Sequence, residues 1–189
     1  GQGWALTPKL EDGLGELYGR RVGLVGWGAT AQQLAPVLDA LGATVAFCAQ
    51  HAHAAPYAQR SFEDLLAESD VLSLHLPLTE ATARMLDANA LARLPTGAII
   101  INTARGGLID ESALLAALGS GALAGAGLDV FDQEPLSEDH PFLTLPQVVL
   151  TPHSAWLTQE TLRRSLTTAV ANLHGLHSGG PFHHEVPPP

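Results

Sequence analysis

Basic residues are few in this sequence, and lysine is almost missing. Of its 189 residues, 9 are Lys or Arg against 19 that are Asp or Glu, so the formal net charge at pH 7 is −10. Lys9 is the single lysine. Nucleic acids and anionic membrane surfaces attract proteins through clustered Lys and Arg. The composition therefore argues against a partner that is nucleic acid or membrane.

Cysteine and long apolar runs are scarce as well. The one cysteine, Cys48, excludes an internal disulfide framework and fits a reducing compartment. No stretch approaches the roughly 18 consecutive apolar residues of a membrane span, and no basic, apolar signal segment opens the sequence. Because 46% of the residues are hydrophobic, we expect a folded, cytoplasmic domain.

Short apolar runs alternate with helix-like segments from Arg21 onward. The predicted strands are 22–25, 44–48, 71–74, 98–102, 125–130 and 147–150, and the predicted helices are 29–41, 62–68, 88–94, 111–118 and 158–176. This alternation predicts an α/β fold of the Rossmann type, a doubly wound parallel sheet with helices on both faces. Pro36 lies inside the first helix and is expected to kink it without ending it.

Three segments are expected along the chain. Residues 1–20 are Gly-rich with mixed charge and are typical of a connector, residues 21–177 form the dinucleotide-binding domain, and the Gly/Pro-rich residues 178–189 form a flexible tail.

A glycine loop follows the first predicted strand and opens the first helix. Its sequence, Gly26-Trp27-Gly28-Ala29-Thr30-Ala31, is the dinucleotide fingerprint with alanine in the third position. Gly26 permits the tight turn, and Gly28 lets the backbone approach a pyrophosphate. The helix start, with Ala29 and Thr30, offers free N–H groups and a positive dipole end. Because the strand–turn–helix context is met, the sequence predicts a site for NAD or NADP.

The acid that usually holds the adenosine ribose is missing. It is expected about twenty positions after the loop, where this chain has Ala49, and no arginine stands beside it to grip the extra phosphate of NADP. Arg60 is the nearest arginine. His51 and His53 are either donors to the cofactor or exposed loop residues. No Cys or carboxylate completes a metal-ligand set around them, so the choice between NAD and NADP stays open.

Charged side chains follow three later strands at the sheet edge where ligands bind in parallel α/β folds. Arg105 follows the strand 98–102, Asp129 and Glu134 come at and after the end of the strand 125–130, and His153 follows the strand 147–150. Each alone has a structural reading, as a surface ion pair, a solvated acidic loop or a capping histidine.

Together these side chains suit the reduction of a 2-keto acid. The guanidinium of Arg105 binds a planar carboxylate through two hydrogen bonds. The imidazole of His153 protonates the carbonyl oxygen as hydride arrives, and Glu134 nearby would favour the imidazolium form. The sequence therefore predicts a catalytic set of Arg105, Glu134 and His153.

The motifs VGLVGWGATA, HLPLT, GAIIINTARGGLIDESALLAAL, GAGLDVFDQEPL and VVLTPHSAW resemble the D-isomer-specific 2-hydroxyacid dehydrogenases, in the same order and at the same spacing. The resemblance implies the same catalytic set and places Asp129 near the nicotinamide carboxamide. It also implies a homodimer. It implies cofactor contacts at His75, Leu76, Pro77, Thr82, Thr103, Ala104 and Ala155.

The sequence differs from this family in two ways. The ribose-binding acid is absent, and only about twenty residues precede the glycine loop, where family members carry most of a substrate domain. The resemblance therefore implies that residues 1–20 are the remnant of an inter-domain hinge and that most of the substrate domain is absent from this chain. The alternative reading is a non-catalytic scaffold that senses dinucleotides, as in corepressors that resemble this family.

Overall fold

The computed structural model describes residues 15–184. These residues form two compact units, one ending at Pro152 and one beginning at His153. The predicted domain 21–177 includes parts of both units, and its limits stay a prediction.

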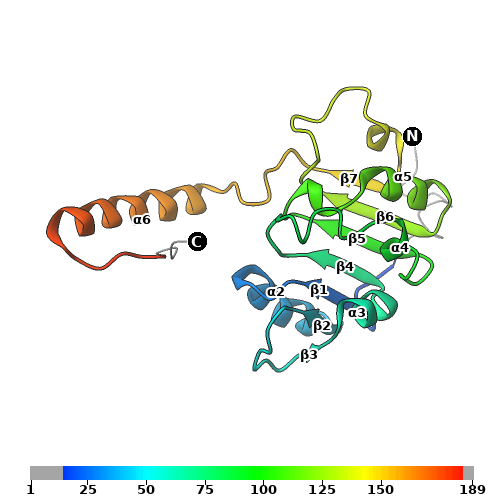
Figure 1. Cartoon of the computed structure of the whole chain (residues 1–189), viewed down its shortest axis with the longest axis horizontal. Coiled ribbons are helices and arrows are strands. Elements are labelled where there is room, and N and C mark those ends of the chain that lie inside the picture. Colours follow the sequence, from blue (N-terminus) through cyan, green and yellow to red (C-terminus); the bar gives the residue numbers. More distant parts are fainter. Residues whose placement is uncertain (1–14, 185–189) are drawn as a thin grey trace, which may run out of the picture. The chain divides into compact units, whose positions relative to one another are not determined.

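The first unit contains a parallel sheet. Its strands are β1 (Arg21–Val25), β2 (Thr44–Cys48), β3 (Ala58–Gln59), β4 (Val71–Leu74), β5 (Ala98–Asn102), β6 (Leu123–Leu128) and β7 (Val148–Leu150). They lie in the order β3-β2-β1-β4-β5-β6-β7, and every pairing is parallel. The chain runs outward from β1 in one direction and from β4 in the other (Figure 1). A doubly wound sheet of this kind confirms the predicted fold.

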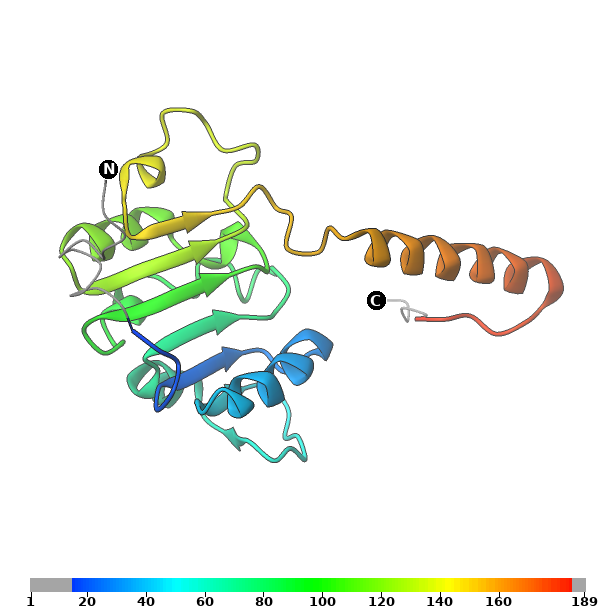
Figure 2. The ribbon, with the colours of Figure 1, turned by 180° about the vertical axis from the view of Figure 1, so that it is seen from behind.

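Helices cover both faces of this sheet. They are α2 (Ala29–Ala40), α3 (Phe62–Glu68), α4 (Ala88–Leu91) and α5 (Glu111–Gly119), with two short 3-10 helices, η1 (Gly106–Leu108) and η2 (Pro141–Thr144). Figure 2 shows α2 in front of the sheet, on the face opposite α4 and α5. One core cluster gathers Leu24 and Phe47 against Ala35 of α2, and the larger one gathers Leu72 and Ile100 beneath the other helices. Alternation along the strands sends neighbouring side chains to opposite faces, which produces the two clusters.

Some predicted bounds differ from the structure. The helix predicted over 88–94 ends at Leu91, and the following N–H groups of Arg93 and Leu94 donate to carbonyls only three residues back. Pro95 explains this tightening, because a proline disfavours helical backbone in the residue before it. The strand predicted over 125–130 is Leu123–Leu128, so Asp129 lies just past its end. β3, with two residues and no apolar run, was not predicted.

Pro36 does not end α2, as predicted, since the helix continues to Ala40. The kink itself stays a prediction.

The second unit contains α6 (Gln159–Ser178). The hydroxyl of Thr158 accepts a hydrogen bond from the N–H of Thr161 and caps the start, and Gly179 ends the helix in the left-handed conformation. The side chain of Asn172 then bonds the backbone of His183 at 2.8 and 3.1 Å, so the segment after the helix folds back along it. In the described part of the chain, no helix has both the length and the apolar character that crossing a membrane requires.

Candidate cofactor and active site

Gly26 closes the first turn after β1 and has no room for a side chain. Its φ angle is +98°, and a Cβ atom there would lie 2.4 Å from the carbonyl oxygen of His75. Its N–H donates to the carbonyl of Cys48 at 3.0 Å. The residue therefore joins the ends of β1, β2 and β4, and only glycine combines that angle with that approach.

Gly28 has the opposite surroundings. Its φ angle is −79°, and no atom lies within 4 Å of where a Cβ would be. It precedes the first residue of α2, and neither a capping side chain nor a first-turn carboxylate occupies that helix start. The open space and the positive end of a twelve-residue helix suit an anionic group.

A cavity of about 620 Å³ lies in front of this helix start. Its walls are Gly28, Ala29 and Thr30, the segment Leu74–Leu78 after β4, and Thr103, Ala104 and Arg105 after β5. The cavity thus lies between β1 and β4, where the strand order reverses and α/β sheets bind ligands. Among these, Gly28, Ala29, Thr30, His75, Leu76, Pro77, Thr103 and Ala104 were predicted to contact the cofactor, and Arg105 was predicted to be catalytic.

A second cavity begins on the other side of the glycine loop. Ala49, His51, His53, Arg60 and Thr82 line it, together with Trp27 and Cys48. Gly28, His75, Leu76 and Pro77 line both cavities. The two cavities are therefore parts of one elongated groove, and the predicted ribose position, Ala49, lies in its second half.

His75 is a neutral group in the middle of this groove. Burial lowers its pKa below the ordinary value for histidine, and its Nε2 atom lies 2.9 Å from the hydroxyl oxygen of Ser73. A histidine with a lowered pKa adds no full positive charge to this part of the groove. Burial also raises the pKa of the nearby Cys48 thiol, which keeps it protonated and unreactive.

Thr82 shapes the groove through hydrogen bonds of its own. Its hydroxyl donates to the carbonyl of Pro77 at 2.8 Å and accepts from the N–H of Thr79 at 2.8 Å. The geometry supports a role for Thr82 in holding the loop after β4, and its contact with the cofactor stays a prediction.

Asn102 fixes the turn that carries Arg105. Its side chain is buried, donates to the carbonyl of Arg105 at 2.8 Å and accepts from the N–H of Ala104 at 3.0 Å. Arg105 itself is exposed, and its Nη1 donates to the carbonyl of Ala104 at 2.6 Å. The backbone is thus held by the strand end while the guanidinium stays accessible to a carboxylate.

The loop that carries Glu134 packs directly against the Arg105 turn. A Cβ on Gly106 would lie 2.0 Å from the carbonyl carbon of Phe131 and 2.4 Å from the nitrogen of Asp132. The Glu134 carboxylate accepts from the N–H of Phe131 at 3.0 Å. The structure therefore brings together the two loops that carry Arg105 and Glu134.

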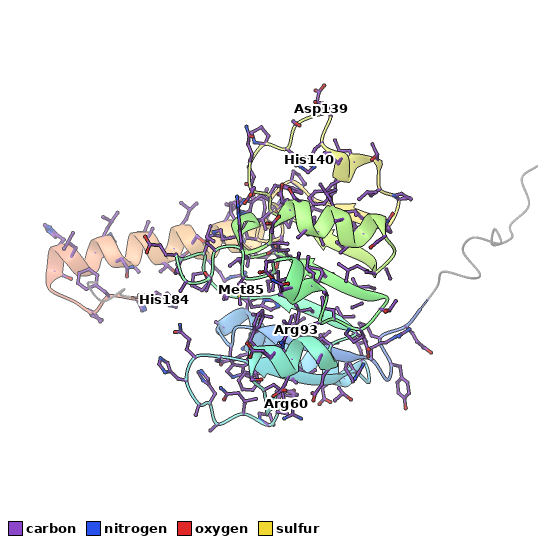
Figure 3. The ribbon with its side chains drawn as sticks, turned by 45° about the vertical axis from the view of Figure 1, so that its right-hand side comes forward. Arg60, Met85, Arg93, Asp139, His140 and His184 are labelled. Carbon is purple, nitrogen blue, oxygen red and sulfur yellow. The ribbon has the colours of Figure 1, made fainter. Side chains whose placement is uncertain are left out.

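Glu111 of α5 holds the connection between β6 and β7, which carries both Glu134 and His140 (Figure 3 labels His140). One oxygen of Glu111 accepts from the N–H of Asp132 at 2.8 Å, and the other lies 3.5 Å from Nε2 of His140. The Nδ1 atom of His140 accepts from the N–H of Phe142 at 3.3 Å, so its Nε2 carries a proton that can point to Glu111. Neither residue was predicted from the sequence. Glu111 has the position of an ordinary acidic residue in the first turn of a helix.

Asp129 is buried just past β6, with 3% of its surface exposed. Its N–H donates to the carbonyl of Asn102 at 2.9 Å, and its carboxylate accepts from the hydroxyl of Thr151 at 2.5 Å. Thr151 follows β7 and was also missed from the sequence. Strand-end residues of β5, β6 and β7 are therefore tied together at one edge of the sheet.

His153 and Ala155 belong to the second unit, so the predicted meeting of His153 with Arg105 and Glu134 stays a prediction. The backbone of His153 is left-handed, with a φ angle of +50°, and its carbonyl accepts from the indole N–H of Trp156 at 3.1 Å. Among the described residues, no group of three or more His, Cys, Asp or Glu side chains is placed to hold a metal ion.

Comparison with known proteins places this geometry in a family. Residues 2–155 match the sequence profile of the D-isomer specific 2-hydroxyacid dehydrogenase NAD binding domain. Glyoxylate reductase of Aeropyrum pernix is 38% identical over 180 residues, which are 92% of this chain and 52% of that protein. The chain thus spans about half the length of the curated relative.

Two solved structures share the fold closely. D-lactate dehydrogenase of Lactobacillus jensenii with NAD+ has a TM-score of 0.86 and 31% identity, over 92% of this chain and 57% of the other. The NADPH-dependent glyoxylate/hydroxypyruvate reductase of Sinorhizobium meliloti, in complex with NADP and sulfate, has a TM-score of 0.82 and 31% identity, over 88% and 55%. The chain therefore belongs to the D-isomer specific 2-hydroxyacid dehydrogenase family and matches its NAD-binding domain.

Proposed function

We propose that this chain is the cofactor-binding half of an NAD(P)-dependent dehydrogenase that interconverts 2-keto acids and D-2-hydroxy acids. The observation that carries the proposal is the groove across the β1–β4 switch point, which has the Arg105 turn at one end. The loop of Glu134 is packed against that turn. A dinucleotide site and a carboxylate-binding arginine on one sheet edge are what a hydride transfer to a keto acid requires.

The groove residues fit a nicotinamide dinucleotide. Gly28 leaves open space before the positive end of α2, which suits the pyrophosphate. The cavity with Ala49 suits the adenosine end, and the cavity with Thr103 and Ala104 suits the nicotinamide end. Leu76, Pro77 and Thr82 line the groove wall, and Asp129 is proposed to bind the carboxamide. The cofactor would supply the hydride, and the chain's own groups would bind and orient the cofactor.

The substrate chemistry falls to three side chains. Arg105 binds the carboxylate of the keto acid through two N–H groups and orients its carbonyl. His153 gives a proton to the carbonyl oxygen during reduction and takes it back in the reverse direction. Glu134 favours the protonated imidazole. The left-handed backbone of His153 fits a functional position, since such a conformation costs on the order of 1 kcal/mol and persists where the surroundings hold it.

The remaining parts of the proposal concern the whole protein. The relative named above is about twice as long as this chain, and we propose that the further length supplies a substrate domain joined through residues 1–20. We also propose a homodimer. Apolar side chains such as Val149 on β7 and Leu166 and Leu173 on α6 are exposed, and contact with a second copy of the chain would bury such surface. The proposed compartment is the cytosol.

Assays of a protein that contains this chain together with the proposed substrate domain would test the activity. With a panel of 2-keto acids and reduced cofactor, His153→Asn should lower kcat by about 100- to 10,000-fold with little change in cofactor affinity. Asparagine tolerates the left-handed backbone, so this variant keeps the local fold. Arg105→Lys should mainly raise KM, because the ammonium group of lysine cannot make the two parallel hydrogen bonds that a guanidinium makes to a carboxylate.

Glu134→Gln provides a pH control for the same assay. Loss of the negative charge that we propose acts on His153 should shift the pH profile of keto-acid reduction, so that the rate begins to fall at a lower pH than in the parent. Equal rates with and without His153 would remove it from the mechanism. Binding of cofactor without turnover of any keto acid would favour the dinucleotide-sensing scaffold.

A further inference from the structure

A cluster of nitrogen-bearing side chains surrounds the adenosine end of the groove, away from the proposed reaction chemistry. His51 and His53 follow β2, and Arg60 follows β3, and all three line the cavity that contains Ala49. No Asp or Glu is among the described residues that line this cavity. Arg60, which is eleven positions after Ala49 in the sequence, is thus brought to the ribose position by the short strand β3.

The loop between Ala49 and His53 is held in place by one side chain. Gln59 of β3 accepts from the N–H of His53 at 3.1 Å and donates to the carbonyls of Ala49 at 3.3 Å and His51 at 2.8 Å. A side-chain amide that bonds three backbone groups fixes the shape of a loop that lacks a ladder of its own. Arg60 is the next residue in the chain, so these hydrogen bonds of Gln59 also fix the backbone position from which the Arg60 side chain extends.

Aromatic packing supports the same loop from beneath. Trp27 of the glycine loop stacks on the buried ring of Phe47, with centroids 4.0 Å apart. The ring of His53 meets Phe47 edge-on at 6.2 Å. The glycine loop and the histidine loop therefore share one buried support, and the basic cluster has a defined position relative to the helix start at Gly28.

Arg60 is available for an anion. In the structure its Nε lies 3.2 Å from a carboxylate oxygen of Glu68, and the two side chains are 41% and 49% exposed. An exposed ion pair of this kind holds its partners weakly, because water and salt screen it. A phosphate in the cavity, with about two negative charges near pH 7, would compete well for the guanidinium.

We propose that Arg60, with His51 and His53, forms a subsite for the 2′-phosphate of NADP(H), so that this chain prefers NADP(H) to NAD(H). The inference rests on the proposed cofactor site and adds the choice of cofactor, which the sequence left open. Ala49 cannot repel the phosphate as an acid there would. The attraction comes from an arginine that is distant in the sequence and adjacent in the fold.

Titration of the chain with NADPH and with NADH tests the proposal, with the tryptophan fluorescence of the chain and the fluorescence of the reduced cofactor as readouts. One charge-assisted contact corresponds to about a tenfold to hundredfold difference in affinity, so NADPH should bind at least about tenfold more tightly. Arg60→Gln should remove most of that preference and lower the affinity for NADH far less than the affinity for NADPH. Arg93→Gln is the matched control, since it removes an exposed arginine that lines neither cavity (Figure 3).

Two further measurements separate the phosphate from the rest of the cofactor. Adenosine 2′,5′-bisphosphate should compete with NADPH better than adenosine 5′-monophosphate, and Arg60→Gln should make the two equal. Glu68→Gln should shift the preference the other way, toward tighter NADPH binding, because it frees the guanidinium.

The outcomes distinguish this inference from the proposed function. If both cofactors bind with equal affinity and Arg60→Gln changes neither, the subsite is wrong and the cofactor groove stands. If the folded chain binds neither cofactor, the proposed function fails and the subsite fails with it.

Discussion

Thr151 shows how much one hydroxyl group can contribute at the edge of this sheet. It donates to Asp129, which is 3% exposed. Thr151→Val keeps the shape of the side chain and removes the donor, so the free energy of unfolding should fall by about 1–3 kcal/mol, the usual cost of taking a donor away from a buried acceptor. Urea unfolding measures this difference.

Thr144→Val is the control for that measurement. Thr144 is exposed and donates to the carbonyl of Pro141 at 2.8 Å, a neutral acceptor beside water, so its removal should cost less than about 1 kcal/mol. Equal losses in the two variants would show that the bond to Asp129 has no special weight.

At the scale of single residues, the sequence predicted those site residues that directly follow a strand. Gly26, Gly28 and Arg105 follow apolar runs, and the structure places all three along one groove or its rim. The fingerprint assigned a tight turn to Gly26 and a close backbone approach to Gly28, and the structure gives Gly26 a φ angle of +98° and leaves open space at Gly28. Gln59 could not be assigned a role, because its three hydrogen bonds depend on a loop conformation that no local pattern encodes.

At the scale of elements, the loops that carry Arg105 and Glu134 pack against each other at Gly106, and we propose that this contact lets the two side chains act together. Gly106→Ala would place a methyl group against the backbone of Phe131 and Asp132. Overpacking of this kind costs about 1–3 kcal/mol, and separation of the loops should also lower the activity of the full enzyme. Urea unfolding and keto-acid reduction measure the two effects.

Gly119→Ala provides the comparison for the loop contact. It also adds a methyl group to a glycine with an ordinary φ angle, but no atom lies within 4 Å of the new Cβ. At the end of α5, this change should leave stability unchanged or raise it by about 0.5–1 kcal/mol. If Gly106→Ala behaved in the same way, the packing of the two loops would not matter.

The starts of β1 and β4 are joined by an ion pair that makes stability depend on pH. Arg21 donates to both oxygens of Asp70, at 2.7 and 3.2 Å, and this bond lowers the pKa of Asp70 below its ordinary value. Stability from the pair is therefore complete above about pH 4 and is lost as pH falls through the lowered pKa.

Asp70→Asn should cost about 1 kcal/mol or less at pH 7, because both side chains are partly exposed. The difference between variant and parent should shrink as the pH falls from 5 toward 2. Thermal unfolding across that range measures it, and a constant difference would show that the charge of Asp70 does not contribute.

Strand order also belongs to the element scale, and here the sequence was informative. Continuous apolar runs between helices predicted a parallel, doubly wound sheet, and the observed order has this form. The short strand β3 was not predicted, because two residues carry no periodic pattern. Yet β3 brings Arg60 to the groove, so an element too short to predict contributes to the predicted choice of cofactor.

At the scale of the whole molecule, we propose that the chain supplies one half of a site. It matches 52% of the length of a glyoxylate reductase, and it supplies the cofactor groove, the arginine and the glutamate loop. We expect this half to bind cofactor with little or no turnover of keto acid, because a second wall is needed to exclude water from the reacting atoms.

The most direct test of this account is a calorimetric titration of the chain, and of its Gly28→Val variant, with NADH and NADPH. Because the position of a Cβ on Gly28 is open, the variant should keep the thermal stability of the parent. Its side chain would occupy the space assigned to the pyrophosphate, so affinity should fall by about 10- to 1,000-fold. The account predicts one bound cofactor per chain in the parent and much weaker binding in the variant. Equal binding by both folded proteins would contradict it.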